Sequence, residues 1–174
     1  MFKYTSNDDY IMSGDEQKII VEWVKNNYKT FKPTGYHRGM NSLQNYSDVP
    51  ECIWNIKQRI VEKEGLENEK QDPFFKDAVG YMWEGGELHR HTDPNIENLI
   101  HVRYNVYVQI PHEGGIPVYN NIRCNLKERT YICCRSGIDY HWCEKVIGER
   151  ERIVLSFGFM LPKERIENII YEYE

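Results

Sequence analysis

Apolar residues recur every three or four positions in the first third of the chain. One such run follows the pattern Ser13-x-x-Glu16, which is typical of a helix start. Its apolar members are Ile19, Ile20, Trp23, Val24 and Tyr28. The run predicts an amphipathic helix over about residues 14–29. A second helix is predicted after Pro50, and its apolar face is formed by Ile53, Ile56 and Ile60.

From Ala78 onward the period of the pattern changes to two. Across residues 101–110 the even positions are apolar and the odd positions are polar. Across residues 150–159 the odd positions from Ile153 are apolar, and arginines and a serine stand at even positions. This alternation predicts strands with one packed face and one face that carries hydrogen-bond donors. Gly and Pro residues separate several short strands of this kind, a texture typical of a sandwich or barrel.

The predicted architecture is therefore α+β, with N-terminal helices that buttress a barrel-like β core. A chain of 174 residues is long enough for one well-packed domain and too short for two ordinary ones. We expect one domain over residues 1–174. About residues 1–75 would give helical support, about 76–160 would form the β core, and 161–174 would be a C-terminal tail.

Composition and charge narrow the class of protein. With 40% hydrophobic and 28% charged residues, the chain is typical of soluble globular proteins. Its formal charge of −5 and the lack of a dense Lys/Arg run disfavour nucleic acid as a partner. The five cysteines show no CxxC spacing, and the N-terminus has no apolar signal-peptide core. We expect a cytoplasmic protein with free thiols and, without an apolar run of about 20 residues, no membrane span.

Candidate chemistry is concentrated in four residues of the β region. His91 and Asp93 are two positions apart, which places both side chains on one face of a strand end. His141 follows 48 residues after Asp93, and Arg152 follows eleven residues after His141 on the polar face of the last strong strand.

Two histidines and one carboxylate leave three adjacent positions open on an octahedral metal, as non-haem Fe(II) oxygenases require. Two open positions can chelate a 2-oxo acid, and the third can take dioxygen. The distal carboxylate of 2-oxoglutarate would be costly to bury unpaired, and the guanidinium of Arg152 can meet it with two charge-assisted hydrogen bonds. Ser156 shares this strand face and could donate another hydrogen bond to the co-substrate.

Three stretches between residues 81 and 159 read YMWEGGELHRHTD, RYNVYVQIPHEGGIPV and HWCEKVIGERERIVLSFGF. With these stretches the chain resembles the 2-oxoglutarate/Fe(II) dioxygenase superfamily, in particular its prolyl-4-hydroxylase-like branch. The resemblance assigns His91, Asp93 and His141 to iron and Arg152 to the co-substrate. It also assigns Tyr81 and Tyr107 to the co-substrate, because family members often have tyrosines at these places.

The fold that the resemblance implies is a double-stranded β-helix of the jelly-roll, cupin-like type. The implied activity is hydroxylation of an amino acid, a peptidyl side chain or a small metabolite, with release of succinate and CO2. Asp93 favours hydroxylation over halogenation, because halogenating members have a small residue at that position. The segment after Arg152 lacks the second arginine of the nucleic-acid demethylase branch, so DNA repair is disfavoured.

Several assignments have simpler alternatives. His37, His101 and His112 are best explained as hydrogen-bonded structural residues, and His89 could replace one metal ligand. Arg152 could instead pair with Glu149 or Glu151, and Tyr81 and Tyr107 could simply fill the barrel. Arg103, Asn105 and Trp83 could contact the substrate. For Arg103 and Asn105 the alternative is a plain solvated face, and for Trp83, as for Trp142, it is the core.

Two other functions remain open at this point. The chain could be a non-catalytic metal- or ligand-binding cupin-like barrel, in which the three residues hold Zn²⁺ or nothing. It could also be a nucleic-acid modifying oxygenase, although the acidic pI argues against this. The sequence leaves the substrate and the oligomeric state undetermined.

Overall fold

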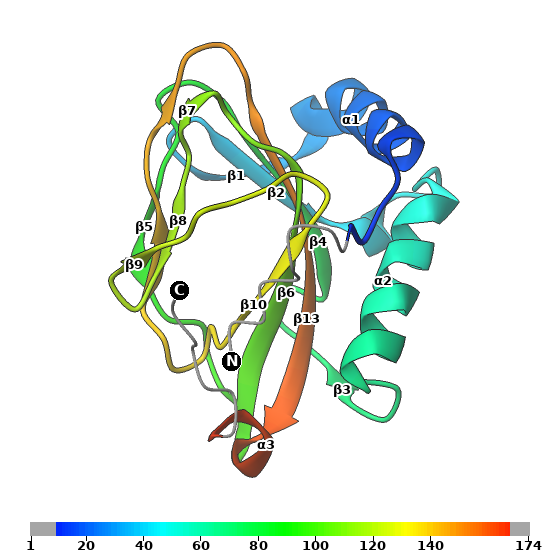
Figure 1. The fold of residues 1–174 in the computed structure, drawn as a ribbon, viewed down its shortest axis with the longest axis vertical. Helices are drawn as coiled ribbons and strands as arrows, with labels where there is room; N and C mark the ends of the chain where they lie inside the picture. The colour runs from blue at the N-terminus through cyan, green and yellow to red at the C-terminus, as the bar shows by residue number, and fades with distance from the viewer. Residues whose placement is uncertain (1–9, 168–174) are drawn as a thin grey trace.

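The two predicted helices are present in the computed structural model, which describes residues 10–167 (Figure 1). Helix α1 (Gly14–Asn27) begins with the expected capping box, in which Ser13 and Glu16 bond reciprocally. It ends two residues earlier than expected, and the 3-10 turn η1 (Tyr28–Thr30) follows. Helix α2 (Glu51–Glu64) follows Pro50 and ends at Gly65, whose left-handed backbone stops the helix.

The β region forms two principal antiparallel sheets. The larger has the order β1-β2-β4-β13-β6-β10, and β3 pairs with β13. Its strands are β1 (Lys32–Gly35), β2 (Arg38–Ser42), β3 (Lys70–Gln71), β4 (Asp77–Met82), β6 (Leu99–Gln109), β10 (Tyr131–Cys134) and β13 (Arg152–Pro162). The smaller has the order β5-β11-β8-β9. Its strands are β5 (Leu88–His91), β8 (Pro117–Tyr119), β9 (Ile122–Arg123) and β11 (His141–Cys143).

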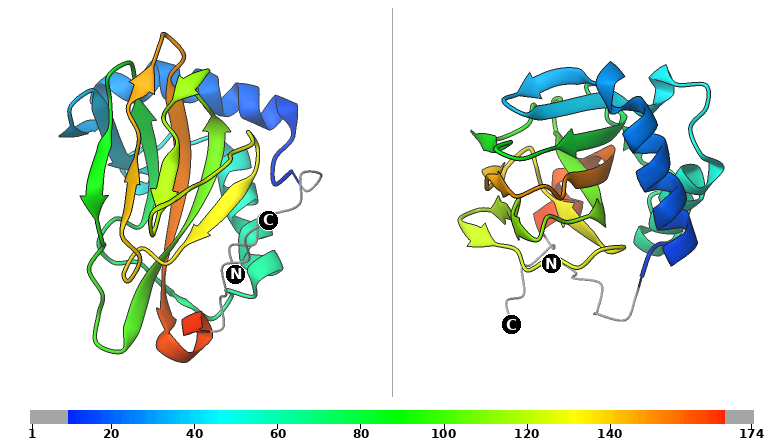
Figure 2. Two further views of the ribbon diagram at one scale, coloured as in Figure 1. Left: turned by 60° about the vertical axis from the view of Figure 1, so that its left-hand side comes forward. Right: turned by 90° about the horizontal axis from the view of Figure 1, so that it is seen from above.

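Three short elements complete the described chain. Strand β7 (Glu113–Gly114) pairs with β12 (Val146–Ile147), η2 (Leu43–Asn45) follows β2, and α3 (Lys163–Glu167) follows β13. Figure 2 shows the two principal sheets face to face and α1 and α2 on the outer side of the larger sheet. The arrangement is a mixed α/β fold of jelly-roll character.

Apolar and polar residues alternate along β6 and β13, so the two faces of the larger sheet differ in polarity. On the helix side, the apolar positions pack with α1 and α2 into the main core, which includes Ile20, Ile56, Val106 and Leu155. The polar positions face the smaller sheet. Burial of one large apolar side chain stabilises the fold by about 1.5–3 kcal/mol, so the helix side supplies most of the packing energy. The inner side can therefore hold polar groups.

Two sequence expectations need correction. Residues 1–75 were expected to give helical support, but they also contain β1, β2 and β3, and β1 and β2 extend the larger sheet. The polar face of β6 is not solvated, because Arg103 is only 7% exposed and His101 is fully buried. All five cysteines lie in the described range, and no disulfide joins any two of them there. In the described part of the chain, no helix combines the length and hydropathy needed to cross a bilayer.

Candidate functional site

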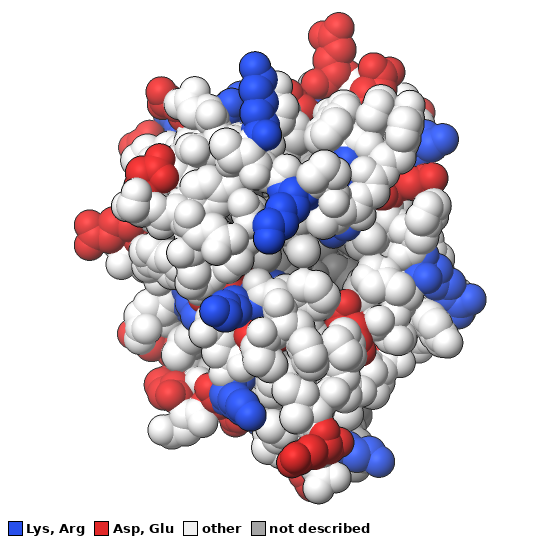
Figure 3. All heavy atoms as spheres, turned by 180° about the vertical axis from the view of Figure 1, so that it is seen from behind, with Lys and Arg blue, Asp and Glu red and all other residues white. Residues whose placement is uncertain are grey.

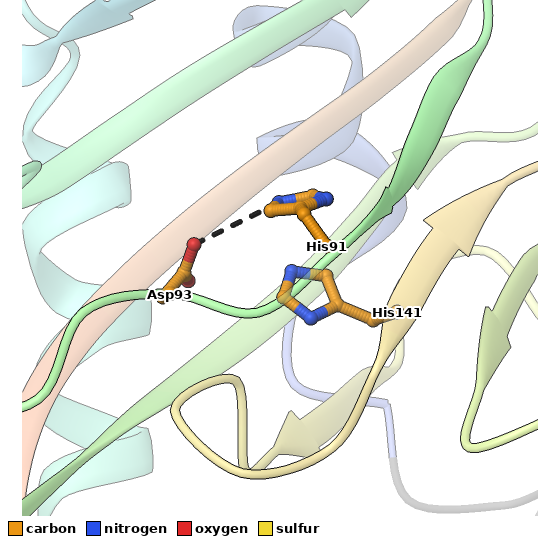
Figure 4. Close-up of side chains that lie close together, drawn as sticks. All are labelled: His91, Asp93 and His141. Carbon is orange, nitrogen blue, oxygen red and sulfur yellow. Dashed lines mark ion pairs between the residues drawn. The ribbon is translucent and has the colours of Figure 1, made fainter.

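His91, Asp93 and His141 come together at the edge where β5 meets β11. His91 ends β5, His141 begins β11, and the two residues are direct partners in the antiparallel pairing. Asp93 lies two residues after β5, and its backbone N–H donates to the Ser136 carbonyl at 2.7 Å. The three side chains point toward one another (Figure 4), and their ligand atoms lie within 4.8 Å of one another. This cluster could hold a metal ion.

Both imidazoles are oriented by backbone carbonyls. Nδ1 of His91 lies 2.7 Å from the His89 carbonyl oxygen, and Nδ1 of His141 lies 3.1 Å from the Asp139 carbonyl oxygen. A carbonyl oxygen can only accept, so each Nδ1 carries the proton and each Nε2 keeps its lone pair. Burial, followed by the charge of His91, lowers the pKa of His141. Neutral imidazoles with a free Nε2 are the form that binds metals.

A buried polar network stands behind Asp93. Oδ2 of Asp93 lies 3.6 Å from Nδ1 of His101, and Nε2 of His101 lies 3.1 Å from Oδ2 of Asp72. Asp72 also accepts from Arg103 at 2.7 Å and from the Phe74 N–H at 2.7 Å. Burial alone would raise the pKa of Asp72, but the hydrogen bond from His101, the other donors and the charges of His101 and Arg103 outweigh burial and lower it to about 2. The network fixes a carboxylate-histidine pair behind Asp93.

A cavity of about 260 Å³ extends between the two sheets from His91, Asp93 and His141. Arg152, at the start of β13, borders it and makes no ion pair with any residue between 10 and 167. Its Nε is buried without a hydrogen-bond partner in this part of the chain. A guanidinium in a cavity without a counter-ion is costly, which indicates that an anion belongs there.

A chain of three hydroxyls and one amide begins beside Arg152. The guanidinium carbon is 5.4 Å from the ring centroid of Tyr107, whose hydroxyl is 3.1 Å from that of Tyr119. Nδ2 of Asn105 donates to the Tyr119 hydroxyl at 3.1 Å. Ser156 accepts from Nε of Arg103 at 2.7 Å and donates to Asn105. Burial raises the pKa of Tyr107 and of Tyr119, so both phenols stay protonated at neutral pH and can donate.

The other predicted site residues lie in several places. Tyr81 borders the cavity, but its hydroxyl donates to Glu151 at 2.8 Å and its ring stacks on Tyr28 in the helix-side core. Asn105 and Arg103 border the cavity, although Arg103 is held by Asp72. Trp83 follows β4, is 36% exposed and is outside the described residues that border the cavity.

Two simpler alternatives are ruled out by the contacts. Arg152 does not pair with Glu149 or Glu151; the carboxylate of Glu151 instead accepts from Tyr81 and Gln109. The cluster that could hold a metal ion consists, among the described residues, of His91, Asp93 and His141, and His89 contributes its backbone carbonyl to the His91 ring.

Sequence reasoning missed Tyr119, Asp72 and Arg38. Tyr119 ends β8 opposite His141. Strand β8 has only three residues, too few for the alternation of apolar and polar residues to show which face Tyr119 takes. Asp72 pairs with Arg103 across 31 positions, and Arg38 borders the cavity from β2, a strand that the sequence pattern did not reveal.

Comparisons with known proteins rest on structure alone. No family model matches the sequence, and no curated protein matches it. A viral collagen prolyl hydroxylase, vCPH from Paramecium bursaria Chlorella virus-1, solved with 2-oxoglutarate, superposes with a TM-score of 0.65 at 16% identity, over 87% of this chain and 92% of its own.

Two bacterial structures are also similar. HygX from Streptomyces hygroscopicus, with nickel and 2-oxoglutarate bound, has a TM-score of 0.63 at 11% identity, covering 94% of this chain and 83% of its own. A Pseudomonas putida prolyl-4-hydroxylase has a TM-score of 0.59 at 14% identity, covering 89% and 91%. At these identities the likeness concerns the fold. It confirms that the chain has the fold of these oxygenase structures.

Proposed function

We propose that the chain is one oxygenase domain that uses Fe(II), 2-oxoglutarate and dioxygen to hydroxylate a substrate, with release of succinate and CO2. One observation carries the proposal: the unpaired guanidinium of Arg152 borders the same cavity as the cluster of His91, Asp93 and His141. A metal cluster alone would also suit a storage or structural site. An additional unmatched cation inside the cavity calls for an anionic co-substrate.

The donor set fits Fe(II). Two neutral imidazoles and one carboxylate on one side of a site are the ligands of non-haem Fe(II) oxygenases, and they leave other positions open. His91, Asp93 and His141 would hold the ion, which when bound supplies the oxidative chemistry. Asp93 also keeps a carboxylate where a halogenating enzyme would lack one, which supports hydroxylation.

Arg152 would bind the C5 carboxylate of 2-oxoglutarate. The phenols of Tyr107 and Tyr119 lie beside it and stay protonated, so one of them can donate a further hydrogen bond to that carboxylate. Tyr119 borders the cavity and suits this role better than Tyr81, whose hydroxyl is directed to Glu151. Ser156 would act through Asn105, because its proton is directed to that side chain.

The strand order supports the finer description of the fold. In the larger sheet, β4, β13, β6 and β10 lie side by side in that order. In the smaller sheet, the order is β5, β11, β8 and β9. Along the chain these eight strands alternate between the two facing sheets except at the hairpin of β8 and β9, a winding that supports a double-stranded β-helix. The cluster and Arg152 border the cavity between those sheets, which would hold the co-substrate in one orientation.

The substrate class that fits is an amino acid, a peptidyl side chain or a small metabolite. Structures with this fold include prolyl hydroxylases, one of them from Trichoplax adhaerens with a peptide fragment, and HygX with hygromycin B bound. On the face in Figure 3, Lys and Arg side chains are interspersed with Asp and Glu. That face thus offers no continuous basic track for nucleic acid.

The test is anaerobic binding followed by turnover. Fe(II) and 2-oxoglutarate together should give a weak visible charge-transfer band, and admission of air should produce succinate at a rate that depends on Fe(II). The variant His141→Ala should give neither signal. A wild-type protein that binds Fe(II) fully without any band, and forms no succinate, would be a non-catalytic barrel.

A further inference from the structure

A second arginine faces the same cavity from the other side of β4. In the sheet, Arg38 of β2 lies opposite Met82 of β4, and Met82 lies opposite Arg152 of β13. Residues that are direct partners across strands project from the same face of the sheet. Arg38 and Arg152 are thus two strands apart on the inner face, about 10 Å between backbones, and both border the cavity.

Arg38 has only neutral partners. Its NH1 donates to the carbonyl and to the hydroxyl of Thr34, at 3.1 and 2.9 Å, and its NH2 approaches the sulfur of Met40 at 3.9 Å. It forms no ion pair with any residue that the structure describes. Burial, reinforced by the charge of Arg152, lowers the pKa of Arg38 to about 10. The side chain is still charged at neutral pH.

The proposed co-substrate does not neutralise this charge. Asp93 is the only acidic residue among the described residues that border the cavity. Arg103 already has Asp72 as its partner. With Fe(II) and doubly charged 2-oxoglutarate bound, the charges of the ion, Asp93, Arg152 and the co-substrate cancel. Arg38 remains the unmatched charge.

We propose that Arg38 and Thr34 form a substrate subsite that binds a carboxylate, so the substrate is an acid. The inference rests on the proposed function, because it takes Arg152 as the co-substrate's partner. The guanidinium offers a planar pair of N–H donors that match a carboxylate. The Thr34 hydroxyl accepts from Arg38, so its own proton is available to the same anion. The carboxylate can be the α-carboxylate of a free or C-terminal amino acid or an acidic side chain.

The experiment separates the substrate subsite from the co-substrate site. Mn(II)-loaded protein is first saturated with N-oxalylglycine, which mimics 2-oxoglutarate and cannot be decarboxylated. Matched acids and primary amides are then titrated by calorimetry. One arm uses the N-acetyl amino acids against their α-amides. The other uses the α-amides of N-acetyl aspartate and glutamate against those of N-acetyl asparagine and glutamine.

Wild-type protein should bind at least one acid about tenfold or more tightly than its amide, and the arm that responds identifies the kind of carboxylate. Arg38→Gln should remove that preference, and Arg38→Lys should keep part of it. Neither variant should alter the affinity for N-oxalylglycine by more than about threefold. Arg123→Gln is the matched control, because Arg123 is an exposed residue of β9 paired with Glu144.

Two results would overturn the inference. The first is that no acid binds wild-type protein better than its amide. The second is that Arg38→Gln weakens N-oxalylglycine binding about tenfold or more, which would make Arg38 part of the co-substrate site. Failure of the proposed function has another signature, in which wild-type protein does not bind N-oxalylglycine at all. The acids can then still be titrated against the protein with Mn(II) alone.

Discussion

Replacement of Arg152 by methionine should separate ligand binding from stability. In the free protein, Arg152 makes no ion pair with any residue in the described range, and its Nε has no hydrogen-bond partner there. Arg152→Met therefore breaks no ion pair and removes a charge that is costly to hold in a cavity. The loss is limited to contacts with Tyr107, a hydrogen bond and a ring contact, of which the ring contact contributes about 0.5–1 kcal/mol. The melting temperature should stay within roughly 2–4 °C of wild type.

The same substitution should severely weaken binding of the co-substrate. The C5 carboxylate would enter the cavity without its charged partner, at a cost of about 2–5 kcal/mol, or roughly 30- to several-thousand-fold in the dissociation constant. Fe(II) affinity should barely change, because Arg152 is not among the three clustered ligands. Calorimetry with N-oxalylglycine on Mn(II)-loaded protein measures the first effect, and competition with a metal-binding dye measures the second.

Arg103→Met is the matched control. Arg103 pairs with Asp72 at 2.7 Å inside the protein, and removal of one member of a buried pair costs about 3–5 kcal/mol. For a chain of this size, that cost lowers the melting temperature by roughly 6–20 °C. The reasoning about Arg152 is refuted if Arg152→Met binds N-oxalylglycine as tightly as wild type. It is also refuted if Arg152→Met lowers the melting temperature as much as Arg103→Met does.

Three further predictions concern the ligands and the network behind them. Asp93→Ala and His141→Ala should each lower Fe(II) affinity by orders of magnitude with little change in the circular dichroism spectrum; wild-type iron binding by both would refute the ligand set. Asp72 has its folded pKa lowered from 3.8 to about 2, so its contribution to stability is present above pH 3.8 and is lost as the pH falls through 2. The difference in free energy of unfolding between wild type and Asp72→Asn, measured with urea, should shrink by about 2 kcal/mol from pH 5 to pH 2, and a constant difference would contradict this. Gly158→Ala would place its Cβ 2.6 Å from the Cβ of Asp72 and should destabilise the protein by about 1–3 kcal/mol. Gly14→Ala is the control, because the nearest neighbour of its Cβ is at 3.9 Å, and it should not destabilise the protein. Equal melting temperatures of the two variants would disprove the clash.

The helices and the strand faces could be read from the sequence because they depend on local periodicity. The repeats that contain Ile20 and Ile56 place those side chains on one helix face, and the alternation in residues 101–110 separates Val106 from Tyr107. The candidate metal cluster could be proposed from the sequence for a similar reason. His91 and Asp93 are only two positions apart, and a distant His141 and Arg152 complete a pattern whose spacing is itself informative.

Only the tertiary structure decided how far-apart polar residues meet. Asp72 reaches Arg103 because β3 and the segment after it pack along β13, and Tyr119 reaches Tyr107 because the two sheets face each other. Arg38 enters the cavity through a pairing with β4 that no period in the sequence reveals. Such contacts depend on strand order and register, which are set by the packing of the whole chain and not by neighbouring residues. The sequence by itself therefore determined which residues could hold a metal, and the fold determined which arginines border the same cavity as those residues.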